Sequence, residues 1–212
     1  MSSVRAILFD IGGVLLTNGW DHTERAAVYE QFHVNAEEFE ARHPDVYDAW
    51  ERGRITLDDY LNATLFDEPQ LFTKEDFLTA MKAQSRELDG GASGVLRQLA
   101  AENHYLLGFL NNEARELNKY RLDTFGLRSL GEVFLCSCYV GLRKPEPAIY
   151  RLAVDVLQLP ASEVIFVDDR VGNVQAAAAV GLNAIRYTTE QALREDLKKR
   201  GVEFGNKGHV QG

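Results

Sequence analysis

The sequence predicts an α/β fold: a Rossmann-like open parallel sheet flanked by helices, with an all-helical cap inserted after the first strand. Two observations carry this prediction. Short apolar runs without strict alternation recur along the chain, and such runs are typical of strands buried on both faces. Helical patterns separate the later runs, which indicates right-handed βαβ units and a parallel sheet.

The expected strands are five short runs rich in valine, isoleucine, leucine and phenylalanine. Between the later runs lie four segments with helical patterns. Pro145 is expected to open one of these helices and Gly181 to follow another, in agreement with the usual positions of these residue types. The strands are expected at residues 4–9, 105–110, 132–136, 164–167 and 182–187, and the helices at 94–103, 113–125, 145–157 and 173–181.

Residues 18–88 contain no strand pattern, and their apolar side chains recur at helical spacing. Three pairs in this segment have the spacing of a capping box at a helix start: Asn35 with Glu38, Thr56 with Asp59, and Thr73 with Asp76. We therefore expect about four helices here, given the usual helix length. The predicted domains are an α/β core (1–17 and 89–200), a helical cap (18–88) and a glycine-rich tail that is a candidate for disorder (201–212).

Charge and composition limit the partners of the chain. Its net charge of −9 argues against a nucleic-acid or anionic-membrane surface, because both need basic side chains. No apolar stretch approaches the roughly 20 residues that span a bilayer. The first apolar run is short and stops at Asp10, which is unlike a signal peptide. Cys136 and Cys138 alternate in a predicted strand, a poor geometry for a disulfide, so we expect free thiols and a cytoplasmic location.

Polar residues follow four of the predicted strands. The carboxyl ends of parallel strands meet at one edge of a sheet, where binding sites form. Any single aspartate there is commonly a turn residue or a helix cap, but that explanation would have to hold at four strand ends at once. The residues concerned are Asp10, Asn111 and Asn112, Arg143 and Lys144, and Asp168 and Asp169.

These side chains together indicate phosphoryl transfer. Three carboxylates repel one another unless a cation or protons offset them, and Lys144 offsets only one. Mg²⁺ takes oxygen ligands and shares its coordination shell with phosphate groups. A carboxylate nucleophile, amide donors, a lysine and a metal are suited to a reaction through an aspartyl-phosphate.

The order of these residues resembles the haloacid dehalogenase (HAD) superfamily, in its phosphatase-rich branch with a helical (C1-type) cap. The four family motifs resemble, in order, FDIGGVLL (9–16), GFLNN (108–112), GLRKPEPAIY (141–150) and VIFVDDRVGNVQAA (164–177). Together with the cap they cover nearly the whole chain.

The resemblance implies roles for individual residues. Asp10 is the expected nucleophile, and Lys144 balances the charge on Asp10 and on the phosphoryl oxygens. Asn111, followed by Asn112, stands where the family usually has a serine or threonine that binds a phosphoryl oxygen, and its amide still donates a hydrogen bond. The implied Mg²⁺ ligands are Asp10, the main-chain carbonyl of Gly12, Asp169 and the supporting Asp168.

Gly12 is the main departure from the family pattern. Family phosphatases usually carry at this position a second aspartate that protonates the leaving group and then activates water. Glycine does neither, and general acid–base catalysis contributes typically about 10²–10⁴-fold. The substrate then has a good leaving group, water or a cap residue supplies the proton, or turnover is low. The cap residues of suitable type are Asp21, His22, His43 and Asp45.

The predicted function is therefore Mg²⁺-dependent hydrolysis of a small phosphorylated metabolite, for example a sugar phosphate. A low-turnover protein that binds phosphate esters is the alternative. A 2-haloacid dehalogenase is less favoured, because those enzymes use no metal and typically lack the paired carboxylates Asp168 and Asp169. Arg52 and Arg54, in a turn of the cap, are solvated surface charges or anchors for a second anionic group. Monomer and homodimer both remain open.

Overall fold

The computed structural model describes residues 3–205 of the chain. Five parallel strands form one sheet in the order β3-β2-β1-β4-β5, with β1 at its centre, which confirms the predicted open parallel sheet. Each strand lies within one residue of the corresponding predicted run or inside it. The strands are β1 (Ala6–Phe9), β2 (Leu106–Asn111), β3 (Val133–Cys136), β4 (Val164–Asp168) and β5 (Asn183–Arg186).

The register of the central strands sets the height of the site. Phe9 at the end of β1 lies level with Phe109 of β2 and with Val167 of β4. Asp10 directly follows Phe9, and Asp168 directly follows Val167, so the two aspartates lie side by side at the carboxyl edge of the sheet. This is the convergence that the strand ends predicted.

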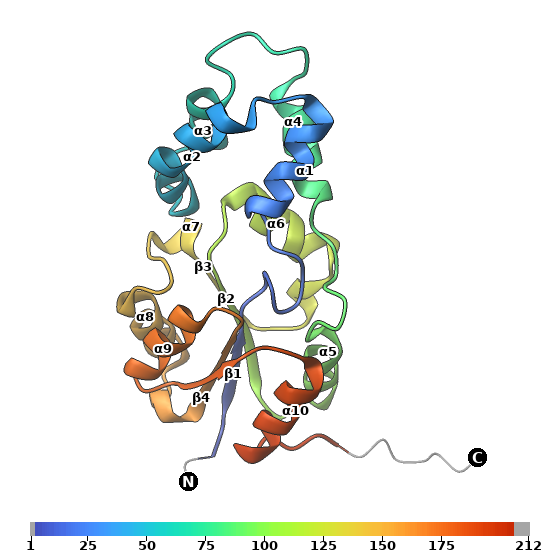
Figure 1. Cartoon of the computed structure of the whole chain (residues 1–212). Helices are drawn as coiled ribbons and strands as arrows, with labels where there is room; N and C mark the ends of the chain where they lie inside the picture. Colours follow the sequence, from blue (N-terminus) through green and yellow to red (C-terminus); the bar gives the residue numbers. More distant parts are fainter. Residues whose placement is uncertain (1–2, 206–212) are drawn as a thin grey trace, which may run out of the picture.

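Both faces of the sheet are covered, which explains the unbroken apolar strands. Ile7 and Phe9 point into a core formed with α5, α6 and α10, whereas Ala6 and Leu8 point into a core formed with α8 and α9. Figure 1 shows these helices on opposite sides of the sheet. The flanking helices are α5 (Ser93–Glu102), α6 (Arg115–Thr124), α8 (Pro147–Leu157), α9 (Val171–Ala179) and α10 (Glu190–Lys199).

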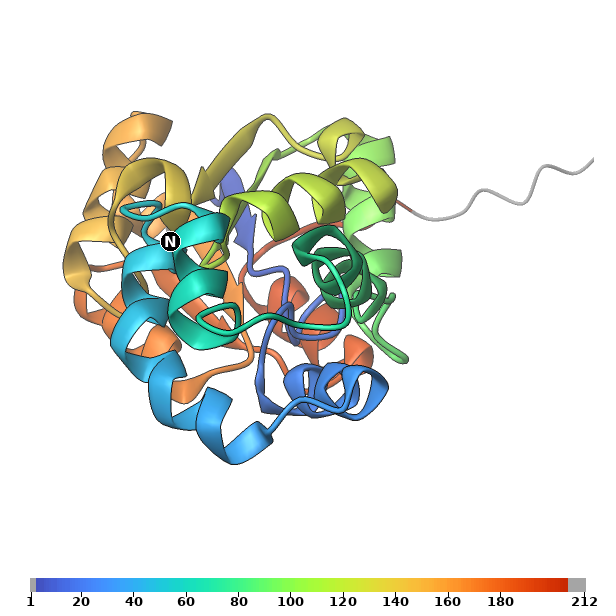
Figure 2. The same cartoon turned by 90° about the horizontal axis from the view of Figure 1, so that it is seen from above.

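Four further helices lie above the carboxyl edge of the sheet, and Figure 2 looks down onto them. Aromatic side chains of these helices and of Trp20, just before α1, form a separate cluster that includes Phe39 and Tyr60. We propose residues 18–88, which contain these helices, as a cap domain. The helices are α1 (His22–Phe32), α2 (Ala36–Glu51), α3 (Leu57–Thr64) and α4 (Lys74–Ala83).

The predicted helix starts in the cap are confirmed. Thr56 and Thr73 each form a full capping box with the aspartate three residues on. Asn35 accepts a hydrogen bond from the backbone N–H of Glu38 at the start of α2. A cap of this kind is worth about 1 kcal/mol.

The local structure differs from the prediction at several places. The helix expected to begin at Pro145 begins at Pro147. Helix α10 was not predicted, nor was the single turn α7 (Ser137–Val140). Cys138 therefore lies in α7 instead of extending β3, and this turn brings its Sγ within 3.4 Å of the Sγ of Cys136, with both thiols free and buried.

The C-terminal residues are only partly covered by the structure. Val202 is buried, and the backbone N–H groups of Glu203 and Gly205 donate to Tyr105 and Glu102, so the predicted disorder does not hold for residues 201–205. Residues 206–212 lie outside the described residues. Within the described part, no helix has the length and apolar character needed to cross a membrane.

Candidate active site

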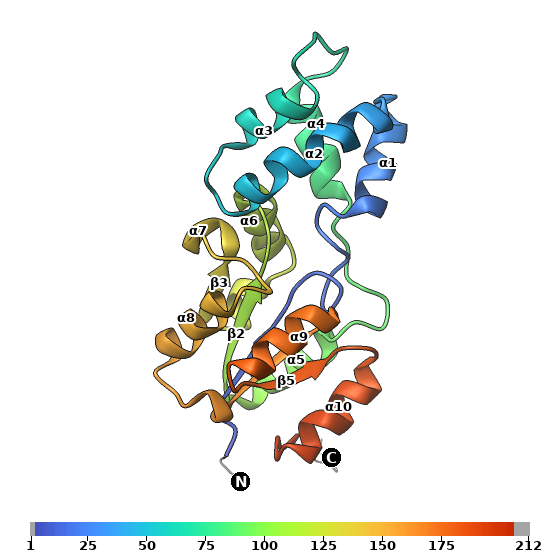
Figure 3. The ribbon, with the colours of Figure 1, turned by 60° about the vertical axis from the view of Figure 1, so that its left-hand side comes forward.

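A cavity of about 570 Å³ opens between the carboxyl edge of the sheet and the cap. Figure 3 shows the two parts facing each other from another side. The strand ends and the loop before α8 contribute Asp10, Gly12, Asn112 and Lys144 to its lining. The cap side contributes Trp20, Asp21, Arg25, His43, Tyr47 and Glu51.

Asp10 is held firmly at the floor of this cavity. Its backbone N–H donates to the carbonyl of Val167, at 2.8 Å, and this bond extends the β1–β4 ladder by one residue. Its Oδ1 accepts a hydrogen bond from the backbone N–H of Ile11, also at 2.8 Å. A carboxylate fixed in this way is oriented before any substrate arrives.

Lys144 lies between two buried carboxylates. Its Nζ is 2.9 Å from Oδ1 of Asp10 and 2.7 Å from Oδ2 of Asp168. Burial acts to lower the pKa of Lys144, but the two carboxylates outweigh it and raise the pKa above its ordinary value. Burial raises the pKa of Asp10 to about 7, with the Asp168 charge adding to the rise and Lys144 opposing it. One ammonium thus faces two carboxylates, and the group has an excess of negative charge.

Asp168 and Asp169 have different environments. Both oxygens of Asp168 accept hydrogen bonds, from Lys144, from the side chain of Asn173 and from the backbone N–H of Arg170. Asp169 instead keeps a buried Oδ1 without a hydrogen-bond partner. Asp168 is therefore suited to position Lys144, and Asp169 has an oxygen free for another ligand.

The carboxylates fit a hard divalent cation. Oxygen atoms of Asp10, Asp168 and Asp169 all lie within 4.8 Å of one another. Gly13, at φ +72°, makes room for them, because a Cβ there would lie 2.5 Å from Oδ2 of Asp169. Burial and the neighbouring Asp168 raise the pKa of Asp169, which marks a carboxylate short of compensating positive charge. Oxygen ligands at this spacing are typical of Mg²⁺.

Added Mg²⁺ should raise the melting temperature of the protein, and more at pH 8 than at pH 5. At 100 times Kd the stabilisation is about 2.7 kcal/mol, which corresponds to roughly 5–10 °C for a chain of this size. At pH 5 the proton held by Asp10, whose pKa is about 7, competes with the metal. Calorimetry with and without Mg²⁺ at both pH values measures the effect, with Asp169→Asn as the control. Equal shifts at both pH values, or a full shift in Asp169→Asn, would contradict the metal site.

The two asparagines at the carboxyl end of β2 point in different directions. Asn112 lines the cavity, and its side chain holds the backbone of Lys144 through two hydrogen bonds of 2.8 and 2.9 Å. Asn111 donates to Oδ1 of Asn118 at 3.1 Å and lines a separate, smaller pocket. Binding of a phosphoryl oxygen by the Asn111 side chain stays a prediction and requires this amide to leave Asn118.

Of the four cap residues considered as proton donors, two line the cavity and two lie elsewhere on the cap. Asp21 and His43 line the cavity, whereas His22 lines a different pocket on the cap surface and Asp45 is exposed on α2. Asp21 caps α1 and pairs with Arg170 at 2.8 Å. Burial and the charge of Arg25 lower the pKa of His43 to about 4, so its imidazole is neutral at pH 7 and holds no proton to spare.

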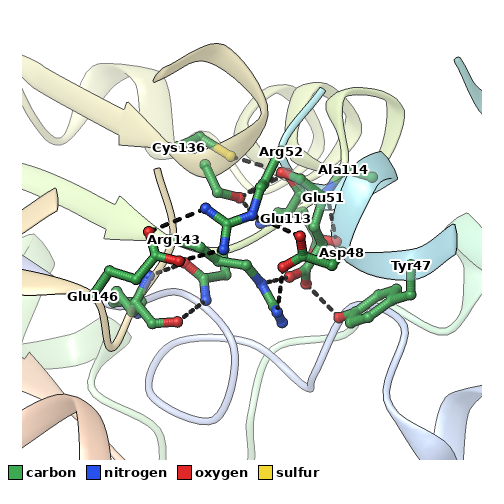
Figure 4. Close-up of polar contacts among 12 residues, drawn as sticks. Tyr47, Asp48, Glu51, Arg52, Glu113, Ala114, Cys136, Arg143 and Glu146 are labelled. Carbon is green, nitrogen blue, oxygen red and sulfur yellow. Dashed lines mark hydrogen bonds and ion pairs between the residues drawn. The ribbon is translucent and has the colours of Figure 1, made fainter. Parts of the chain in front are cut away.

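Ion pairs join the cap to the loop that carries Lys144, as Figure 4 shows. Arg143, directly before Lys144, pairs with Glu51 and, at 3.2 Å, with Asp48 of α2. Because the loop is tied to α2 next to the lysine, movement of the cap is coupled to the position of Lys144.

Arg52 serves the same junction. It pairs with Asp48 at 2.8 Å and with Glu146 of the loop before α8. Arg54 lines a small pocket away from the site. In this arrangement both side chains lie apart from the cavity, so the structure gives no support to a second anion anchor at either position.

Sequence reasoning missed Glu113 and Arg121, which form a buried ion pair of 2.6 Å in the cavity wall. It also missed Arg170 and Asn173, which follow β4 and line the same cavity. A signal for Glu113 was available, because it directly follows Asn111 and Asn112 at a strand end. Arg121, on α6, had no such signal.

Known proteins support a family assignment. The family model for haloacid dehalogenase-like hydrolases matches residues 4–181. The chain is 29% identical to a flavin mononucleotide hydrolase of Arabidopsis thaliana, over 77% of the chain and only 65% of that protein. It is 26% identical to the sesquiterpene phosphatase astK of Aspergillus oryzae, over 93% of the chain and 97% of that protein.

A solved structure has the same fold. It is a HAD family enzyme of Bacteroides thetaiotaomicron in complex with magnesium and inorganic phosphate, with a TM-score of 0.73 and 19% identity over 88% of this chain and 96% of that one. At this identity the likeness concerns the fold alone. The family model, in contrast, covers most of the sequence, and the chain therefore belongs to the haloacid dehalogenase-like hydrolase family.

Proposed function

We propose that the protein is a Mg²⁺-dependent phosphatase that hydrolyses a small phosphorylated metabolite through an aspartyl-phosphate on Asp10. The arrangement around Lys144 carries the proposal: two buried carboxylates share one ammonium, and a third lies beside them with a free oxygen. This arrangement suits both a metal and a phosphoryl group. The phosphatases among the relatives, and the magnesium and phosphate bound by the structural neighbour, add support.

Each residue has a defined task in this reaction. Asp10 attacks the phosphorus atom with its carboxylate group, which the backbone contacts keep oriented. Lys144 neutralises negative charge on the nucleophile and on the phosphoryl oxygens. Asn112 and Asp168 hold Lys144 in place, at its backbone and at its ammonium. Asp10, Asp169 and the Gly12 carbonyl would hold Mg²⁺, which would supply further charge stabilisation for the phosphoryl group.

The cavity favours a polar substrate. Its volume of about 570 Å³ is in the range of small-molecule sites. Arg25, Arg170 and several carboxylates line it, and a hydrocarbon chain would leave these groups without partners. A sugar phosphate or a similar hydroxylated ester fits better, because its hydroxyl groups pair with both charges.

Phosphate release from p-nitrophenyl phosphate and from a panel of phosphorylated metabolites tests the proposal. We expect turnover with Mg²⁺, and we expect chelation of the metal to lower the turnover rate by at least about 10²-fold. The reason is that a bound metal ion stabilises the charge of the transition state by several kcal/mol. Sugar 1-phosphates and 6-phosphates should be compared directly, because the former have the better leaving group. Turnover that is unaffected by chelation would contradict the proposal.

Gly12 favours a second candidate, a protein that binds phosphate esters with little turnover. Glycine keeps a main-chain carbonyl for the metal but lacks the side chain that moves a proton. Titration calorimetry distinguishes this candidate, which requires tight Mg²⁺-dependent binding of an ester that is recovered intact. Appearance of free phosphate during the titration would exclude it.

A further inference from the structure

The side of Gly12 where an aspartate would project leads to a buried ion pair. A Cβ on Gly12 would lie 3.2 Å from Oδ1 of Asn18 and 3.9 Å from Nη1 of Arg121. That nitrogen is 2.6 Å from Oε2 of Glu113. The space toward which the missing acid would point is therefore bordered by Asn18 and the Arg121 guanidinium. Arg121 in turn pairs with the carboxylate of Glu113, in the loop that follows β2.

Gly19 provides the space for this carboxylate. A Cβ at position 19 would lie only 1.9 Å from Oε2 of Glu113 and 2.8 Å from Nη1 of Arg121. Any other residue at position 19 would displace the pair. Glu113, Arg121, Gly12 and Gly19 all line the cavity that contains Asp10.

We propose that Glu113 is the general acid–base catalyst of this enzyme, in place of the side chain that Gly12 lacks. The inference rests on the proposed phosphatase function. As Asp10 attacks phosphorus, the bond to the leaving oxygen breaks, and that oxygen takes the proton of the Glu113 carboxyl group. In the second half, the Glu113 carboxylate takes a proton from the attacking water. The Asp10–phosphorus bond then breaks, phosphate leaves and both side chains return to their starting state.

The surroundings of Glu113 suit both halves of this cycle. Burial raises its pKa to about 7, with Arg121 of α6 opposing the rise and Glu51 of α2 adding to it. Near neutral pH the group is therefore available as acid and as base. Its Oε1 accepts from the backbone N–H of Ala114 at 3.2 Å, which fixes its direction. Tyr47 of α2 and Cys136 of β3 are further titratable groups whose pKa the charge of Glu113 acts to raise.

The other acids of the cavity pair with groups at its rim or at the junction between cap and core. Asp21 is paired with Arg170 at the rim. Glu51 accepts from Tyr47 and from Arg143, so it belongs to the junction between cap and core. His43 is neutral and contacts the hydroxyl of Tyr60 at 2.7 Å.

Glu113→Gln tests the inference, with Glu51→Gln as the matched control, since it removes another buried carboxylate paired with an arginine in the same cavity. On an alkyl phosphate, Glu113→Gln should lower kcat by about 10²–10⁴-fold. On p-nitrophenyl phosphate, whose leaving group needs no proton, it should still release a stoichiometric burst of nitrophenol, followed by slow turnover. Glu51→Gln should change both substrates by the same factor and show no burst.

A rescue variant and the wild-type enzyme provide independent readouts. Gly12→Asp in the Glu113→Gln background should recover at least about tenfold of the alkyl-phosphate activity, because it returns an acid to the same space. In the wild type, kcat/KM for the alkyl phosphate should fall about tenfold per pH unit above pH 7, as Glu113 loses its proton. The kcat/KM for p-nitrophenyl phosphate, which reports the steps up to nitrophenol release, should not follow that fall. This last measurement needs no variant to fold.

The results separate the inference from the function on which it rests. Absence of the nitrophenol burst in Glu113→Gln, no rescue by Gly12→Asp, or parallel pH profiles of kcat/KM for the two esters would overturn the role of Glu113 while leaving the phosphatase intact. A wild-type enzyme without Mg²⁺-dependent turnover, or an active Asp10→Asn variant, would overturn the proposed function itself.

Discussion

Asp10→Asn is expected to lower kcat for phosphate-ester hydrolysis by on the order of 10⁴–10⁶-fold, as losses of a catalytic nucleophile do. The amide is nearly isosteric but does not attack phosphorus. Folding should not suffer, because a neutral side chain removes the repulsion from Asp168 that helps to raise the pKa of Asp10. Phosphate release measures kcat, and acid quench followed by mass spectrometry should detect phosphate on Asp10 in the wild type alone.

The control for this variant is Asp45→Asn, which removes an exposed carboxylate of the cap. Its kcat and melting temperature should match those of the wild type, since surface substitutions usually change stability by less than about 0.5 kcal/mol. If Asp10→Asn retained more than about a hundredth of the wild-type activity without deamidation to aspartate, Asp10 would not be the nucleophile.

Lys144→Met should cost about 3–5 kcal/mol of folding free energy in the metal-free protein at pH 8, as well as turnover. The substitution keeps the bulk of the side chain but leaves Asp10 and Asp168 buried without their cation, and a broken buried pair costs this much. Urea unfolding in the presence of a chelator measures the loss. Lys119→Met, which breaks an exposed pair with Asp123, should stay within about 1 kcal/mol of the wild type.

The loss in Lys144→Met should depend on pH. The pKa of Asp10 is raised to about 7, so its native state holds a proton that the unfolded state releases near pH 4. The contribution of Asp10 to the free energy of unfolding is therefore fully present below pH 4 and is lost as the pH rises through 7. The deficit of the variant should be smaller near pH 4, where Asp10 holds a proton, and reach its full size above pH 7. A deficit independent of pH would show that Lys144 acts through packing alone.

Much of the fold was readable from the sequence because each strand is covered on both faces. The runs around Ile7 and Ile165 are apolar at every position, and the turn and cap residues between the runs are also local signals. Helix α10 was not predicted from the sequence, because only Leu193 and Leu197 form its buried face and the rest of the segment is strongly polar. Helix α8 begins at Pro147 and not at Pro145, and Glu146 between them pairs with Arg52 at the end of α2.

The sequence predicted those residues of the candidate site whose positions follow directly from the ends of the parallel strands. Asp10 and Asp168 meet because parallel register sets their height, and Lys144 was expected there because buried carboxylates need a cation. Asn111 and Asn112 show the limit of this reasoning. Successive side chains of a strand point to opposite faces, so one residue of difference sends Asn112 into the cavity and Asn111 toward Asn118.

The sequence by itself determined the parallel sheet, the helical insertion after its first strand and the cluster of acids around Lys144. Periodicity, turn chemistry and like-charge repulsion are properties of residue types and spacings. Only the tertiary structure decided what surrounds Gly12: the Glu113–Arg121 pair and the space left by Gly19. Those residues come from three different segments, and their juxtaposition depends on how α6 and the cap pack above the sheet. Side-chain direction and packing across segments leave no local pattern.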